Sequence, residues 1–500
     1  MNSLMVVCVH IHFDICLPVF PNLLCSGLCL GAVFSSRLVK ATVNPMYFCY
    51  CTFGKDLFPS PPTLRRWTGD SKIIVSSMKL LLLGRTVRRR FACAIVALLF
   101  TYVLAMPVFA GDWPEWGGPK RDFTVDNVSL ASSWPDSGLR KLWNRTLGDG
   151  YSSIVAAGGR LYVMFCNGDL EHVAALDANT GETIWQHRYP APFIEGTNVE
   201  EFGPGPLSTP LIVEPRIYAI GVTGILHCLD LGSGQVLWKH ELIRELHGTN
   251  LFRGYSASPI GFDGSIIAPV GGPGRAVVAF AADDGSILWK KHDFAISHVS
   301  PIMIRVDDQQ QLVVLGEKTI VGLDPVSGQS FWQHDHPIAG GYISSTPVWG
   351  HDGRLFFSGA YGEGSRCIHL KRTGEKTVAD EIWHSARMRV HHSNVTRIGD
   401  YVYGPSGDFA AIKFMAVKIE TGEVVWQDRR LGRASCLYVD GKVLALQEDG
   451  QLMLASLSPE ELTIHSTAKL FDGRGWTAPT LVGNRMYVRN RKDIMAFELP

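Results

Sequence analysis

One ten-residue pattern returns along residues 139–500, and it constrains the fold more than any other feature of the chain. Its clearest copy runs from Leu176 to Trp185, with Gly181 four residues before the tryptophan. The same glycine–tryptophan spacing returns at Gly234/Trp238, Gly285/Trp289, Gly328/Trp332 and Gly422/Trp426. A period of about 40–50 residues made of short strands predicts a closed ring of β-sheets.

Each repeat is predicted to contain four strands. Apolar residues such as those at 173–176 precede the glycine, and a second strand-like run such as 183–185 follows it. Glycine closes such a hairpin because it adopts a positive φ without steric cost. Upstream of each hairpin, a small polar residue, often followed by proline, begins another apolar segment, as in Ser208-Thr209-Pro210. Two hairpins per repeat make a propeller blade.

The two ends of the repeat region complement each other. Residues 139–145 supply only one strand, and residues 476–499 supply only three. Joined, they make one blade and bring the ring to eight, which removes the free sheet edges that promote aggregation. The sequence therefore predicts an all-β, eight-bladed β-propeller with four-stranded blades, closed by N- and C-terminal strands in one shared blade.

A ladder of tryptophans marks the last strand of each blade. Weaker copies of the pattern end in Trp143 and Trp383, and the eighth copy has no tryptophan near His465. A large flat indole ring at the same position of many blades is better explained by packing against the neighbouring sheet than by ligand binding in each blade. We therefore expect a structural docking role for Trp143, Trp185, Trp238, Trp289, Trp332, Trp383 and Trp426.

The first 138 residues divide into three parts. Residues 1–77 lack the repeat, and we interpret them as a spurious upstream extension, with Met78 as the true start. Residues 78–110 have the basic and apolar regions of a secretory signal, with cleavage expected after Ala110. An uncleaved membrane anchor is the alternative, although the apolar run is shorter than the ~20 residues of a spanning helix. We interpret residues 111–138 as an irregular lead-in strap that packs on the outside of the propeller.

Charge and cysteine content exclude some classes of function. The 47 basic residues balance 47 acidic ones, so there is no electrostatic case for nucleic-acid binding. The cysteines of the repeat region match no metal or redox motif, and we expect buried, reduced side chains at Cys166, Cys228, Cys367 and Cys436. We expect an exported monomer.

The pattern Leu-Asp-x-x-(Thr/Ser)-Gly-x-x-x-Trp resembles the tryptophan-docking repeat of the PQQ-like (quinoprotein alcohol dehydrogenase-like) β-propeller superfamily. The resemblance covers residues 139–500. The lead-in from Asp112 to Asp122 is also similar to exported PQQ-repeat proteins of planctomycete-type bacteria. The superfamily contains quinoprotein dehydrogenases, the outer-membrane assembly lipoprotein BamB and many exported propellers without an assigned role, so the fold alone does not choose a function.

The enzymes of this superfamily imply a definite site: pyrroloquinoline quinone (PQQ) on the propeller axis, a calcium ion held by Glu, Asn and Asp, an Asp base and often two adjacent cysteines. This chain has no such cysteine pair. Alignment of the repeats places two residue rings at the axial ends of the inner strands. The first contains Tyr151, Leu207, Ser256, His298, Ser344, His392, Arg433 and Trp476, and the second Ser153, Thr209, Ser258, Ser300, Thr346, Asn394, Ser435 and Ala478.

Neither ring contains a carboxylate, which argues against calcium–PQQ catalysis. Acidic groups could still come from the loop at residues 191–204, with Glu195, Glu200 and Glu201. Trp476, Arg433 and Asn394 are types that stack on and grip an anionic planar ligand. The candidate axial ligand site comprises Tyr151, Ser153, Thr209, Ser258, His298, His392, Asn394, Arg433 and Trp476. The alternative is that small polar residues simply fit a crowded channel, with water satisfying them.

The sequence favours an exported, non-catalytic propeller that acts as a ligand- or protein-binding scaffold in the periplasm or cell envelope. We assign no catalytic residue and no metal site, and the small-molecule or protein partner is unknown. One alternative is a PQQ-dependent oxidoreductase with bound calcium. Another is an outer-membrane protein assembly factor like BamB, although the expected cleavage site is followed by Gly111 and no nearby cysteine could carry a lipid.

Overall fold

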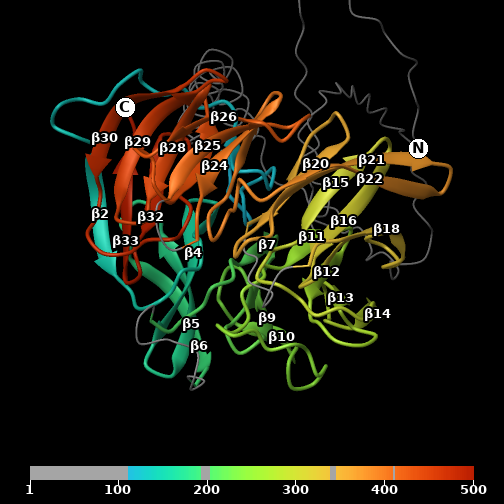
Figure 1. Cartoon of the computed structure of the whole chain (residues 1–500). Helices are drawn as coiled ribbons and strands as arrows, with labels where there is room; N and C mark the ends of the chain where they lie inside the picture. The colour runs from blue at the N-terminus through green and yellow to red at the C-terminus, as the bar shows by residue number, and fades with distance from the viewer. Residues whose placement is uncertain (1–110, 193–202, 338–344, 409–411) are drawn as a thin grey trace, which may run out of the picture. The chain divides into compact units, whose positions relative to one another are not determined.

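The computed structural model describes residues 111–192, 203–337, 345–408 and 412–500, and every regular element in them is a β-strand. The strands form eight sheets, each built on a propeller blade of four antiparallel strands (Figure 1). The four strands follow in chain order except in the last blade, whose outer strand is β2, and in one blade a short fifth strand, β1, is added in parallel. This confirms the predicted eight-bladed propeller. No helix in the described part of the chain is long and apolar enough to span a membrane.

Blades 1 to 4 follow in chain order. Blade 1 contains β3 (Val155–Ala157), β4 (Arg160–Asn167), β5 (Leu170–Asp177) and β6 (Thr183–Pro190). Blade 2 contains β7 (Leu211–Val213), β8 (Arg216–Ile220), β9 (Ile225–Asp230) and β10 (Val236–Glu241). Blade 3 contains β11 (Ile260–Phe262), β12 (Ser265–Pro269), β13 (Val277–Ala281) and β14 (Ile287–Lys291). Blade 4 contains β15 (Ile302–Val306), β16 (Gln309–Leu315), β17 (Thr319–Leu323) and β18 (Ser330–Asp335).

Blades 5 to 8 complete the ring. Blade 5 contains β19 (Val348–Trp349), β20 (Arg354–Gly359), β21 (Gly364–Thr373) and β22 (Lys376–Ser385). Blade 6 contains β23 (Thr396–Ile398), β24 (Tyr401–Ser406), β25 (Lys413–Lys418) and β26 (Val424–Asp428). Blade 7 contains β27 (Ala434–Val439), β28 (Lys442–Gln447), β29 (Gln451–Leu457) and β30 (Leu462–Lys469). Blade 8 contains β31 (Thr480–Val482), β32 (Arg485–Arg489), β33 (Asp493–Glu498) and β2 (Arg140–Thr146).

Blade 8 is the shared blade that the sequence predicts. Strand β2, from the start of the repeat region, pairs antiparallel with β33, from its end, in a register that runs from Arg140↔Glu498 to Thr146↔Asp493. Figure 1 shows the two strands side by side. The pairing supplies the outer strand that β31–β33 lack, so the ring closes through hydrogen bonds between the two ends of the repeat region.

The glycine–tryptophan pattern is explained by contacts between blades. The indole N–H of Trp185 donates to the carbonyl of Leu231 in blade 2 at 3.0 Å, and Trp238 donates to Ala282 in blade 3 at 3.1 Å. Equivalent bonds join Trp143 to Ala178, Trp289 to Pro325, Trp383 to Ile419 and Trp426 to Ser458. The pattern glycine of the following blade lies under the indole: a Cβ on Gly285 would be 2.7 Å from the ring of Trp238. Glycine is needed there for its φ of +75° and for this close approach.

Trp332 differs from the other six. Its indole N–H donates at 2.7 Å to Oε1 of Gln311 in its own blade, and the Gln311 amide donates at 2.7 Å to Thr377 of blade 5. Blade 5 has an extended β21–β22 hairpin whose turn lies at Gly374, so no pattern glycine follows Trp332. The buried side chain of Gln311 therefore links Trp332 of blade 4 to Thr377 of blade 5 through two hydrogen bonds.

The ladder position in blade 7 is held by Ser466, which pairs with Leu454 beside the bulge between β29 and β30. This is the register that Trp185 holds against Ala175 in blade 1. The hydroxyl of Ser466 accepts a 2.8 Å hydrogen bond from the backbone N–H of Trp134 in the lead-in strap. The strap therefore covers the outer strand at the place where the ladder is interrupted.

The lead-in strap does not lie only on the outside, so that expectation was wrong for its first half. Trp113 pairs with Ala156 of β3, and the short strand β1 (Thr124–Val125) pairs in parallel with β27. Trp113 is 3% exposed and Phe123 is 2% exposed. These rings lie against the inner strands because burial there removes a large apolar area from water. Only the second half, after residue 126, runs over blades 7 and 8, where Leu130 bonds to Asp440.

All four cysteines of the described residues are free and buried, as expected for apolar fillers: Cys166, Cys228, Cys367 and Cys436. Burial raises the pKa of the Cys367 and Cys436 thiols to about 12. Their thiolates are therefore too scarce at neutral pH for nucleophilic chemistry.

Candidate functional site

All eight blades contribute to one cavity of about 890 Å³, which we call the axial cavity. It lies where the chain enters the inner strands, with lining residues such as Tyr151 of blade 1, His298 of blade 4 and Trp476 of blade 8. Trp116 and Phe123 of the lead-in strap also line it. Because the strap bonds to the inner strands β3 and β27, it forms part of the cavity wall.

The structure brings together most of the residues that sequence alignment placed at the axial ends. Seven members of the first ring line the cavity: Tyr151, Leu207, Ser256, His298, His392, Arg433 and Trp476. The eighth, Ser344, lies outside the described residues, as do Glu195, Glu200 and Glu201 of the 191–204 loop. In the second ring, Ser153 and Thr209 do not line the cavity, whereas Ser258 and Asn394 do. Ligand binding by these residues stays a prediction.

Hydroxyls of the second ring fasten neighbouring inner strands to one another. The Thr209 hydroxyl accepts the Ser153 N–H at 3.2 Å, and the Ser258 hydroxyl accepts the Thr209 N–H at 2.9 Å. The chain continues to blade 4, where the Ser300 hydroxyl accepts the Ser258 N–H at 2.9 Å. The hydroxyls of Thr209, Ser258 and Ser300 therefore have backbone N–H partners in the neighbouring blades.

Asn394 has a similar structural role. Its amide N–H donates to the carbonyl of Cys436 and its amide oxygen accepts the Cys436 N–H, both at 2.8 Å. The side chain is 5% exposed and joins blades 6 and 7. Because both polar atoms of this amide are engaged, Asn394 holds the wall of the cavity and is a poor candidate for gripping a ligand.

Arg433 and Trp476 converge on a carboxylate that the sequence analysis missed. Glu448 accepts hydrogen bonds from Arg433 Nη1 at 3.0 Å and from Trp476 Nε1 at 2.9 Å, both through Oε2. Glu448 lies in the turn between β28 and β29. In a blade of antiparallel strands, the turn joining the second and third strands lies at the same end as the start of the first. That topology could have identified Glu448, and likewise Tyr361 in the turn between β20 and β21.

Three side chains pack against the indole of Trp476. Its ring centroid lies 5.0 Å from that of Tyr151 and 4.5 Å from that of His392, and the Arg474 guanidinium lies 5.0 Å from the ring. Trp116 is held differently, with its ring edge-on to Phe123 at 5.1 Å and its N–H bonded to Thr346 at 3.0 Å. These contacts fix both indoles as rigid surfaces of the cavity.

Three histidines of the cavity are neutral at pH 7. Burial, followed by the charge of Arg253, lowers the pKa of His298 to about 4, and its Nδ1 bonds to the Ser256 hydroxyl at 2.6 Å. Burial, followed by the charge of Arg433, lowers the pKa of His391 to about 4. Burial and the neighbouring His391 place the pKa of His392 well below its usual range.

His392 also carries an unsatisfied atom. Its Nε2 is buried and has no hydrogen-bond partner within the described ranges. Its ring lies 4.1 Å from that of His391 and 4.5 Å from that of Trp476. A buried polar atom without a partner is costly, and this one belongs to a residue that lines the axial cavity.

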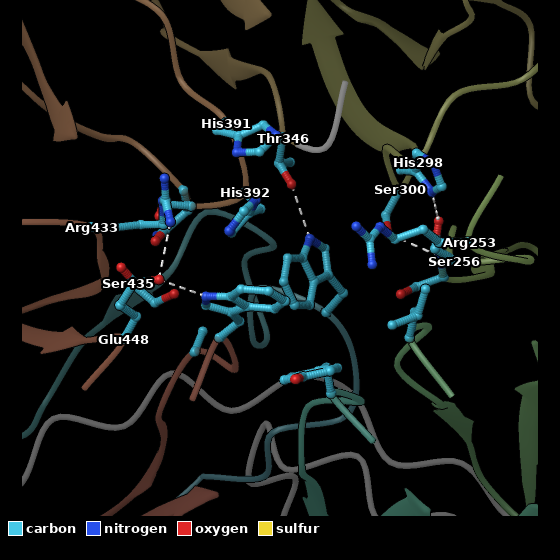
Figure 2. A pocket seen from close by; sticks show the side chains of 18 of the residues that line it. Arg253, Ser256, His298, Ser300, Thr346, His391, His392, Arg433, Ser435 and Glu448 are labelled. Atoms are coloured by element: carbon cyan, nitrogen blue, oxygen red, sulfur yellow. Dashed lines mark hydrogen bonds and ion pairs between the residues drawn. The ribbon is translucent and has the colours of Figure 1, made fainter. Parts of the chain in front are cut away.

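The charges of the cavity favour an anion. Its described lining contains three arginines, Arg253, Arg433 and Arg474, and one carboxylate, that of Glu448. Figure 2 shows Arg433 and Glu448 on one side and Arg253, Ser256 and His298 on the other. Among the described residues, no three His, Cys, Asp or Glu side chains are arranged to hold a metal ion. The cavity therefore offers cationic, hydroxyl and aromatic groups to a ligand.

The proteins similar to this chain in sequence include outer membrane protein assembly factors named BamB. The outer membrane protein assembly factor BamB of Yersinia pestis is 31% identical over 137 residues, which are 27% of this chain and 31% of that protein. The BamB of Escherichia coli K12 is 32% identical over 126 residues, 25% of this chain and 28% of that protein. The chain thus spans about a third of the length of these relatives.

Solved structures share the fold at low sequence identity. BamB from Moraxella catarrhalis has a TM-score of 0.50 and 18% identity, with 72% of this chain and 98% of that chain covered. The quinohemoprotein alcohol dehydrogenase from Comamonas testosteroni has a TM-score of 0.56 and 14% identity, covering 80% and 82%. A europium-containing methanol dehydrogenase has a TM-score of 0.55 and 12% identity, covering 78% and 98%.

The family comparison covers more of the chain. The sequence profile of the family described as outer membrane protein assembly factor BamB matches residues 169–428, just over half of the chain. The matched part runs from the hairpin of blade 1 to the end of blade 6, and it contains the pattern copies that first suggested the superfamily. The chain therefore belongs to the BamB family of PQQ-like β-propellers.

Proposed function

We propose that this protein is a non-catalytic binding scaffold of the cell envelope whose axial cavity holds a small organic anion. One observation carries the proposal: the described lining sets three arginines against one carboxylate around rigid tryptophans. Arginine forms charge-assisted, two-point hydrogen bonds with carboxylates and phosphates. A concave site with aromatic surfaces and a few polar groups is the usual form of a small-molecule site.

Two observations support the proposal that the scaffold acts in the cell envelope. The relatives from Yersinia pestis and Escherichia coli are named as outer membrane protein assembly factors. Residues 78–110, which lie outside the described residues, have the sequence character of a secretory signal. Export would place the propeller in the compartment where those relatives are named to act.

Membership of the BamB family favours a second role, the assembly of outer-membrane proteins through a protein partner. In that role the propeller would present its loops and outer strands to other envelope proteins. Affinity capture of the full chain from its native envelope tests this. Stoichiometric recovery of outer-membrane assembly components would support it, and their absence from a capture that retains the protein would count against it.

The residues fit PQQ only in part. The arginines and the rigid tryptophans suit a planar anion such as PQQ. The calcium ion of a quinoprotein dehydrogenase needs several carboxylate or amide oxygens. Glu448 supplies the only carboxylate of the described lining, and Arg433 and Trp476 already bond to it. The Asn394 amide bonds to Cys436, so we derive no catalytic step through a calcium–quinone pair.

Isothermal titration calorimetry of the purified protein tests anion binding. The titrants are a panel of organic mono- and dicarboxylates and PQQ, the last with and without calcium. Binding of at least one carboxylate, weakened about ten- to a hundredfold in Arg433→Gln, would support the proposal. If an alcohol reduces a dye in the presence of the protein, PQQ and calcium, the protein is an oxidoreductase and the proposal of a non-catalytic scaffold is wrong. The failure of every anion to bind would refute a ligand role for the cavity.

A further inference from the structure

We propose that the axial cavity recognises a polyhydroxylated carboxylic acid of the uronic-acid type, either as a single sugar or as the end of a short acidic oligosaccharide. The inference rests on the proposed function and adds the chemical class of the ligand. Three features of the lining carry it: an imidazole nitrogen without a partner, a wall of hydroxyl groups, and arginines placed beside aromatic surfaces.

The imidazole nitrogen belongs to His392. Its Nε2 has no hydrogen-bond partner in the part of the chain that the structure describes, and the residue lines the cavity. The ring is neutral at pH 7 because burial and neighbouring positive charge lower its pKa. Nε2 of a neutral ring is either a donor or an acceptor, and a hydroxyl group matches both states because it donates and accepts.

The wall presents further hydroxyl and imidazole groups. The Ser256 hydroxyl bonds to His298 at 2.6 Å, and the Tyr361 hydroxyl bonds to His391 at 2.8 Å. The Ser258 hydroxyl accepts a backbone N–H and keeps its own proton for donation. Such paired donors and acceptors match the adjacent hydroxyls of a sugar better than they match a ligand that can only accept.

The arginines and aromatic rings account for the remaining parts of such a ligand. Arg253 and Arg433 lie on opposite sides of the cavity (Figure 2), and their positive charges favour a carboxylate between them. Arg433 also donates to Glu448 and to the carbonyl of Asp408. Trp116 is locked by Phe123 and Thr346, and its indole offers an apolar surface for the C–H face of a sugar ring. The cavity volume of about 890 Å³ leaves room for more than one ring.

Three matched titrants separate the contributions of charge and hydroxyl groups. D-glucuronate carries both, D-glucose carries hydroxyls without the charge, and cyclohexanecarboxylate carries a ring and the charge without hydroxyls. Calorimetry on the purified full chain at pH 7 is expected to show glucuronate or tri-galacturonate binding at least tenfold more tightly than the other two. Equal or tighter binding of cyclohexanecarboxylate would overturn the uronate inference and leave anion binding intact. If no anion binds, both proposals fail.

A histidine pair tests the role of Nε2. His392→Gln should weaken the binding of glucuronate about three- to tenfold, the effect of one neutral hydrogen bond, and leave cyclohexanecarboxylate unchanged. His187→Gln is the matched control, because His187 Nε2 also has no partner among the described residues and His187 does not line the cavity. The inference would be contradicted if His392→Gln lost the same affinity for glucuronate and for cyclohexanecarboxylate, or if its affinity for glucuronate did not fall. Melting curves of the two variants establish that each is folded.

Discussion

Gly285 of blade 3 lies directly beneath the indole ring of Trp238 of blade 2. A Cβ at this glycine would come within 2.7 Å of the ring, while the indole N–H bonds to Ala282 three residues earlier. The pattern glycine of blade 3 therefore packs against the tryptophan of the preceding copy of the pattern. The contact joins two neighbouring copies, so the pattern records the interface between blades.

Gly285→Ala is predicted to destabilise the protein more than the same change at Gly264. Both glycines are in blade 3, with φ of +75° and +73°, so both substitutions cost about 1–2 kcal/mol in backbone strain. Only Gly285 faces an indole, since nothing lies within 4 Å of a Cβ at Gly264. The overlap should add about 1–3 kcal/mol. Denaturant unfolding of both variants measures the difference, and equal losses of stability would show that the indole contact is unimportant.

Trp238→Ala should cost about 3 kcal/mol, the lower end of the range for truncation of a core tryptophan, because Trp238 is only partly buried. The change removes both the indole packing against Gly285 and the hydrogen bond to Ala282. In the double variant Trp238→Ala/Gly285→Ala, the penalty of the alanine at 285 should shrink, because the ring that it overlaps is gone. Strict additivity of the two changes, or an unaltered melting temperature in Trp238→Ala, would refute the docking role.

Asn394→Ala is predicted to cost about 2 kcal/mol or more. The change leaves the N–H and the carbonyl of Cys436 buried without the partners that Asn394 supplies at 2.8 Å. Ser435→Ala is the control, because this residue precedes Cys436 and lines the same cavity. Chemical unfolding should show a large loss of stability for Asn394→Ala alone. A stable Asn394→Ala variant that loses ligand affinity would instead return this residue to the binding site.

Glu171 gives a prediction about pH. This fully buried carboxyl group accepts hydrogen bonds from Tyr189 and the Val222 N–H, and burial raises its pKa from 4.5 to about 7. Because the folded state holds this proton more tightly than the unfolded state, stability should fall as pH rises from about 4.5 to 7.

Glu171→Gln should remove that fall. The variant is expected to be about 3 kcal/mol more stable than the wild type at pH 8 and similar to it at pH 4.5. Unfolding midpoints of both proteins across this range provide the measurement, with the exposed Glu182→Gln as the control. A wild-type slope that persists in the Glu171→Gln variant would assign the pH dependence to other groups.

The fold was predictable because the same strand and turn pattern is repeated along the chain. The spacing of Gly181 and Trp185 recurs often enough to give the blade, and the incomplete ends around Trp143 and Phe497 give the count and the closure. The axial positions followed from the same alignment, since equivalent residues of a ring of blades converge on its axis. Tyr151, His298 and Trp476 line one cavity for that reason.

The sequence could not predict the site residues that lie outside the aligned strand positions of the repeat. Arg253 is in a long connection between blades and has no counterpart to align with, whereas Glu448 is in a turn that recurs in every blade but whose residues differ from blade to blade. Which hydroxyls face the cavity and which bond to a neighbouring backbone depends on three-dimensional register. Thr209 and Ser300 are the same kind of residue in the pattern, yet only Ser300 lines the cavity. The strap has no repeat at all, so the burial of Trp113 and Phe123 left no signal in the pattern.

The pairing of β2 with β33 also imposes an order of events on the newly made chain. Strand β2 is synthesised before every strand of blades 1 to 7, yet its partner β33 follows all of them. Until β33 has been made, blade 8 lacks most of its strands and the ring remains open. Blades 1 to 7 can therefore form in chain order, but the ring can close only after β33 has been synthesised.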